Sequence, residues 1–200
     1  MRLRTFRRRL LSPLAVLALG GLLGGLLGGC GGSAESGPPP AAAAPGVAVS
    51  EFGGTDLAWV ELMIPMDEQL LPVLELVKAK ASDPGLVAVA VELQGVYAAE
   101  LPRLKALSDQ AGLPTDSPHK GHKMPGLVDA DRLEALQAGT GADFEKQATA
   151  VLREHLTQLT NLAGSELANG TSPTVKAIAE HVAKTRGDAN AKLSGAAAGG

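Results

Sequence analysis

Two stretches of the chain carry the same helical pattern at a fixed offset. Ser82-Asp83-Pro84 and Thr171-Ser172-Pro173 each place a capping side chain before a proline, which is typical of a helix start. The apolar residues that follow match in pairs: Leu86 with Val175, Val89 with Ile178, Ala90 with Ala179, and Leu93 with Val182. Two helical hairpins, each with one apolar stripe, bury those stripes best against each other. The repeat therefore predicts an all-α fold, a four-helix bundle made of two repeated helical hairpins.

Helical periodicity and helix stop signals predict where each helix begins and ends. We expect long helices from about 55, from 84 to about 111, from about 142 to 168, and from 173, with a short helix capped by Asp129. Pro65 and Pro72 fall inside the first helix, where each removes a backbone donor, so a bend or break is expected there. Pro102 predicts a kink in the second helix. Aromatic residues make up only 2% of the chain, which fits Leu, Val and Ala helix packing and argues against a β-sandwich.

The first thirty residues have the pattern of an export signal. Five arginines precede an apolar run from Leu10 to Leu27, which ends in small residues before Cys30. Leu27-Gly28-Gly29-Cys30 resembles the lipobox of bacterial lipoproteins, in which the cysteine is lipidated and becomes the mature N-terminus. A retained transmembrane anchor is the alternative, because the run is nearly long enough to span a bilayer. The Gly-rich end and the single cysteine favour lipidation, which predicts a protein anchored to the extracytoplasmic face of the bacterial cell membrane.

The composition predicts four regions in order. Residues 1–29 are the predicted signal peptide, and residues 30–54 are a flexible Gly, Pro and Ala tether that begins at the lipidated Cys30. Residues 55–193 are the predicted bundle domain, and residues 194–200 a disordered tail.

Removal of the signal makes the body of the protein acidic. Its five arginines leave 13 basic residues (18 − 5) against 21 acidic ones, a net charge of about −8. Such a body argues against nucleic-acid binding and against electrostatic adhesion to anionic lipid. Cations are the partners that its charge favours, and the pattern identifies no protein partner.

The stretch from Pro118 to Gly126 joins the two halves and concentrates metal-binding side chains. Its two prolines and two glycines predict a loop between the hairpins. His119, His122 and Met124 have a spacing that can chelate a metal ion. The alternative is a solvated loop without a ligand.

Several motifs resemble a known family. They are Trp59, the run Met63-Ile64-Pro65-Met66-Asp67-Glu68-Gln69, the turn Ala81-Ser82-Asp83-Pro84, and His122-Lys123-Met124-Pro125-Gly126-Leu127 followed by Asp129, Leu133, Gly141 and Phe144. Together they are similar to the ferritin-like domain-of-unknown-function family 305, over about residues 55–193. The resemblance implies an exported four-helix bundle, and some members of the family bind copper through paired histidines and Met-rich segments. The family pattern has adjacent histidines at two places, where this chain has Met66-Asp67 and His155-Leu156.

The resemblance suggests a second candidate metal site, inside the bundle. Met66 and His155 occupy matching positions of the two halves, so they could converge with Met63 if the hairpins pack as the repeat predicts. Thioether and imidazole are ligands that suit Cu(I). Asp67, Glu68 and Glu154 would add carboxylates better suited to harder ions. The alternative is that the two methionines fill the core and the three carboxylates are solvated; His181 is expected on the surface.

The sequence carries no signature of an enzyme. It has no Glu-x-x-His pair of the di-iron type, no Gly-rich phosphate loop after a strand, no Cys-x-x-Cys-His haem site and no Gly-x-Ser-x-Gly nucleophile motif. Two non-catalytic functions remain. The first is a lipoprotein that binds copper or a similar ion through His119, His122, Met124, His155 and Met66. The second is a metal-free structural or protein-interaction module of the cell envelope.

Overall fold

The structure is a computed structural model that describes residues 51–116 and 123–196. These ranges hold five helices and no strand: α1 (Gly54–Lys80), α2 (Pro84–Ala111), α3 (Ala130–Ala138), α4 (Gly141–Asn169) and α5 (Pro173–Ala196). The predicted signal, Cys30 and most of the predicted tether lie outside the described residues, as do His119 and His122. Within the described ranges, none of the helices is both long and apolar enough to cross a membrane.

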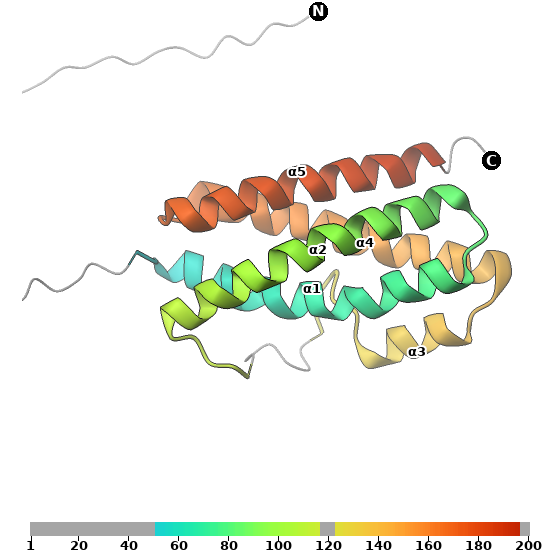
Figure 1. Cartoon of the computed structure of the whole chain (residues 1–200), viewed down its shortest axis with the longest axis horizontal. Coiled ribbons are helices and arrows are strands. Elements are labelled where there is room, and N and C mark those ends of the chain that lie inside the picture. Colours follow the sequence, from blue (N-terminus) through green and yellow to red (C-terminus); the bar gives the residue numbers. More distant parts are fainter. Residues whose placement is uncertain (1–50, 117–122, 197–200) are drawn as a thin grey trace, which may run out of the picture. The chain divides into compact units, whose positions relative to one another are not determined.

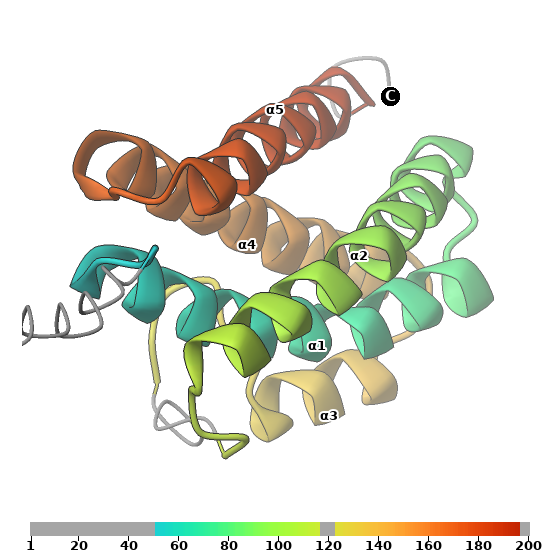
Figure 2. The same ribbon diagram turned by 60° about the vertical axis from the view of Figure 1, so that its left-hand side comes forward.

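The four long helices form two hairpins. α1 packs against α2 and α4 against α5, and the hairpins meet through contacts of α1 with α4 and of α2 with α5 (Figure 1). The short α3 lies on the outer side of α1 and also contacts α4 (Figure 2). The prediction of an all-α bundle built from two hairpins is confirmed. Val47–Gly200 is a compact unit with its own continuous apolar core.

Three of the predicted helix starts are capped by hydrogen bonds to the side chains that the sequence indicated. Asp83 accepts a hydrogen bond from the Gly85 amide (2.7 Å), and Asp129 accepts one from the Arg132 amide (2.9 Å). Ser172 accepts one from the Val175 amide (3.4 Å). Each bond satisfies an amide that the first helical turn leaves without a backbone partner. At the other end of the chain, α5 continues to Ala196, beyond the expected end of the bundle at residue 193.

Of the bend or break expected at Pro65 and Pro72, the break is wrong, because α1 is one continuous helix through both prolines; the bend stays a prediction. Each proline removes the hydrogen bond to the carbonyl four residues earlier, which belongs to Glu61 and Glu68 respectively. Glu68 is exposed and Glu61 is half-buried. Burial of the apolar face of α1 then holds the helix together, since packing outweighs local propensity.

Candidate metal site and the buried polar core

His155 lies at the centre of the bundle with both ring nitrogens hydrogen-bonded. Its Nε2 is 2.9 Å from the Tyr97 hydroxyl of α2, and its Nδ1 is 2.8 Å from the Gly126 carbonyl oxygen. A carbonyl can only accept, so Nδ1 carries the proton and Nε2 accepts from Tyr97. The imidazole is fully buried and joins α4 to α2 and to the segment that precedes α3.

The charge state of His155 follows from its surroundings. The pKa of His155 is lowered to about 4, mainly by burial and also by the nearby Arg186 charge; the Gly126 hydrogen bond and the Glu154 charge oppose this shift. The ring is therefore neutral at physiological pH. Its single lone pair, on Nε2, is the one that accepts the Tyr97 hydrogen bond. A metal ion could bind His155 only by displacing the Tyr97 hydroxyl.

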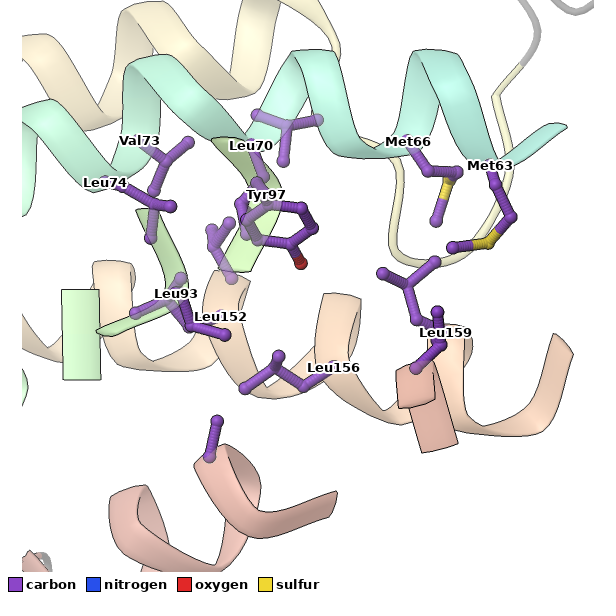
Figure 3. Close-up of a cluster of buried hydrophobic side chains, with 14 of the residues drawn as sticks. Met63, Met66, Leu70, Val73, Leu74, Leu93, Tyr97, Leu152, Leu156 and Leu159 are labelled. Carbon is purple, nitrogen blue, oxygen red and sulfur yellow. The ribbon is translucent and has the colours of Figure 1, made fainter. Parts of the chain in front are cut away.

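Met63 and Met66 are fully buried on the inner face of α1. Figure 3 shows both side chains pointing toward α4, near Leu159. Their positions match the alternative in which these methionines fill the apolar core. Within the described part of the chain, no group of three or more His, Cys, Asp or Glu side chains has an arrangement that could hold a metal ion.

Asp67 corrects the expectation that its carboxylate is solvated. It is completely buried, and its Oδ1 lies 3.3 Å from Nη2 of Arg186, which is also completely buried. Glu100 of α2 makes two further bonds to Arg186, at 3.1 Å and 2.7 Å. The guanidinium also stacks on the Tyr97 ring, with 4.2 Å from Cζ to the ring centroid. The mainly apolar inner faces of α1, α2 and α5 therefore contain a buried ionic cluster that joins these three helices.

This ionic cluster contains two carboxyl groups and one guanidinium. Burial raises the pKa of Asp67 well above its usual value; Arg186 opposes that shift, while Glu100 adds to it through its charge and a hydrogen bond. Burial alone would lower the pKa of Arg186, but Tyr97, Asp67 and Glu100 raise it, so the guanidinium stays charged. The two-bond geometry pairs Arg186 with ionised Glu100. Asp67 is therefore the carboxyl group of this cluster that burial most strongly drives toward its neutral form.

The end of the middle loop is fixed to α4 by the backbone of Gly126. The Gly126 amide donates to Glu154 Oε1 (3.0 Å), while its carbonyl accepts from His155. Arg132 of α3 donates to the other oxygen of Glu154 (2.5 Å). Gly126 has φ of +79°, and a Cβ there would lie 2.7 Å from the Gln158 Cβ, so the position requires glycine. Met124, two residues earlier, is half-buried against the core.

The structure thus separates the predicted site residues into groups. Met66 and His155 belong to the core, and Met124 belongs to the loop end that Gly126 holds on α4. Glu68 and Glu154 are exposed, as is His181, in agreement with the alternative expectation for these residues. Sequence reasoning gave no role to Tyr97, Glu100 and Arg186. A tyrosine and two charges inside otherwise apolar helical stripes were the signal that could have found them.

The architecture defines a class: a bundle of two helical hairpins joined by a long middle loop that is fixed on α4. The chain belongs to the family described as "Domain of unknown function (DUF305)", which matches residues 56–196. A comparison with curated proteins finds no match.

Solved structures share this fold. A DUF305 fragment from Deinococcus radiodurans has 16% identity and a TM-score of 0.63, covering 72% of this chain and 95% of that one. A DUF305 protein from Streptomyces coelicolor, described as secreted, has 17% identity and a TM-score of 0.61, covering 70% and 89%. CopM in its Cu(I)-bound form has 17% identity and a TM-score of 0.60, covering 71% and 94%.

Proposed function

We propose that this protein is a lipid-anchored, extracytoplasmic, non-catalytic bundle that binds copper through its middle loop. The proposed ligands are His119, His122 and Met124, and the proposed anchor is Cys30. Copper is favoured because imidazole and thioether suit Cu(I) and because similar folds include CopM in Cu(I)-bound and Cu(II)-bound forms. The acidic net charge of the mature chain favours cations in general.

The observation that carries the loop site is the attachment of Gly126 to α4. Both its backbone amide and its backbone carbonyl bond to α4 side chains, Glu154 and His155. Met124 is therefore held close to the bundle before any metal arrives. A ligand that is already ordered loses less conformational entropy on binding, which raises affinity.

The core donors do not fit a metal ion in this arrangement. The only lone pair of the neutral His155 ring is engaged by Tyr97 (2.9 Å), and the guanidinium of Arg186 already balances the charge of its carboxyl neighbours. A copper ion at Met66 and His155 would need to displace a buried hydrogen bond, which leaves a polar group unsatisfied. We therefore propose that Met66 and His155 are structural and that copper is held outside the core.

A competition titration tests the loop site. The unit Val47–Gly200 is titrated with Cu(I) against a chelator of known affinity, beside a His119→Ala, His122→Ala variant. The control is His181→Ala, which removes an exposed histidine of α5. We expect stoichiometric, submicromolar binding that the loop variant loses and the control keeps. Equal binding by all three proteins would refute the assignment.

The buried ionic cluster favours a second candidate function that involves no metal. The position after Met66 holds Asp67, which is committed to an internal ionic cluster with Arg186. A bundle stabilised in this way needs no metal to fold, so the chain would serve as a metal-free structural or interaction module at the cell envelope. Absence of Cu(I) binding in the wild-type titration would select this function over the first.

A further inference from the structure

A second pair of acidic side chains is buried at the end of the bundle where the chain enters α1. Asp56 belongs to the first turn of α1 and Glu166 to the last turn of α4, and both are completely buried. The pair lies next to the turn between α4 and α5. It has no part in the proposed copper site.

Asp56 is surrounded by hydrogen-bond donors. It accepts bonds from the Gly53 amide (2.6 Å), the Thr171 amide (3.0 Å), the Thr171 hydroxyl (2.8 Å) and the Ser172 amide (3.0 Å). Burial alone would raise the pKa of Asp56, but the bonds from Ser172, Thr171 and Gly53 hold it well below its usual range. Asp56 is therefore ionised, and it ties the start of α1 to the α4–α5 turn.

Glu166 has the opposite surroundings. Neither of its carboxyl oxygens has a donor among the described residues, although both are buried. The Glu166 carboxyl group lies against Gly170, so any side chain at position 170 would collide with it. A buried carboxylate without donors is strongly disfavoured. The carboxyl groups of Glu166 and Asp56 meet consecutive residues of the α4–α5 turn, Glu166 against Gly170 and Asp56 on the amides of Thr171 and Ser172. A proton on Glu166 would remove its charge and would supply a donor that can face Asp56.

We propose that Asp56 and Glu166 share one proton and form a latch that fastens the start of α1 to the α4–α5 turn. When Glu166 ionises, two like charges face each other in a buried space and the latch loosens. Besides Asp56 of α1, a charged group of α5 also acts on Glu166: Lys176, whose positive charge favours the ionised form of Glu166. The bundle thereby carries a pH-sensitive contact at the point where the chain enters the domain.

The direction of the pH response follows from Glu166. The pKa of Glu166 is raised from 4.5 to about 7, mainly by burial and also by the nearby Asp56 carboxylate, while the charge of Lys176 opposes the shift. The folded protein keeps this proton at pH values where the unfolded chain has lost it. The stabilisation is therefore complete below about 4.5 and is lost as the pH rises through about 7. The contribution of Asp56 has the opposite sign and is lost only in acid, below its usual pKa of 3.8.

The direct test is an NMR titration of the Glu166 side-chain carboxyl in Val47–Gly200. We expect its midpoint near pH 7, and a midpoint below pH 5 would overturn the proposal. This measurement uses the unmodified sequence, so it does not depend on the folding of any variant.

A variant shows whether the proton fastens the latch. Glu166→Gln keeps a donor for Asp56 and cannot ionise, and Glu180→Gln removes a charge from an exposed site on α5 as the control. Hydrogen exchange of the Thr171 and Ser172 amides, which bond to Asp56, reports local opening. At pH 8 we expect these amides to exchange roughly 10–100-fold more slowly in Glu166→Gln than in wild type, from the size of the pKa shift. Equal rates in the two proteins would contradict a latch, and Glu180→Gln should match wild type.

Discussion

Replacement of Arg186 by methionine tests the ionic cluster inside the bundle. The guanidinium is completely buried and makes bonds of 3.1 Å and 2.7 Å to Glu100 and of 3.3 Å to Asp67. Methionine has similar length but no charge, so Arg186→Met leaves a buried carboxylate without its cation. Breaking a buried ion pair from one side costs about 3–5 kcal/mol. With a slope of about 2 kcal/mol per molar urea, the unfolding midpoint should fall by roughly 2 M.

Two further variants separate the charge effect from lost packing. Arg103→Met removes an exposed arginine of α2 and should change stability by no more than about 0.5 kcal/mol. Arg186→Met combined with Glu100→Gln removes both charges, and it should recover at least about half of the loss because no carboxylate is then left unpaired. The reasoning is refuted if Arg186→Met lies within about 1 kcal/mol of wild type, or if the second substitution recovers nothing.

Two more substitutions and one pH effect follow from the same contacts. Tyr97→Phe leaves Nε2 of His155 without a donor and should cost about 1–3 kcal/mol in urea unfolding; an unchanged midpoint would contradict the bond. Gly126→Ala must strain a φ of +79° and push Gln158 aside, so we expect about 1–3 kcal/mol lost and weaker Cu(I) binding in the titration; an unaffected protein would refute the loop attachment. The pKa of His155 falls from 6.5 to about 4, so its contribution to stability is present above 6.5 and is lost as the pH falls through 4. Imidazole NMR should show no protonation of His155 above pH 5, and a midpoint near 6.5 would contradict its burial.

The helical architecture was readable from the sequence because it depends on local signals. The capping residues Asp83, Asp129 and Ser172 each act within one helical turn, so their effect is visible in a short stretch of residues. The sequence did not show that α1 would continue through Pro65, because continuity depends on how much apolar surface the two flanking segments bury together. That quantity is a property of the whole bundle.

The buried polar cluster was not readable in the same way. Arg186 and Asp67 are separated by more than half the chain. The place of Arg186 in an apolar stripe could indicate that it is buried, but nothing local identifies Asp67 as its partner. His155 was found through its place in the repeat, yet its role depends on Tyr97 and Gly126, which belong to two other elements. The loop histidines His119 and His122 stay a prediction from spacing.

The most direct test of the copper assignment is an NMR titration of Val47–Gly200 with Ag(I), a diamagnetic substitute for Cu(I). It follows the His155 ring nitrogens and the Met124 methyl group in one experiment. We predict that the Met124 methyl shifts up to one equivalent of metal, while both His155 nitrogens and the hydrogen bond from Tyr97 stay unchanged. A shift of His155 Nε2 with loss of the Tyr97 bond would contradict the account and place the metal in the core.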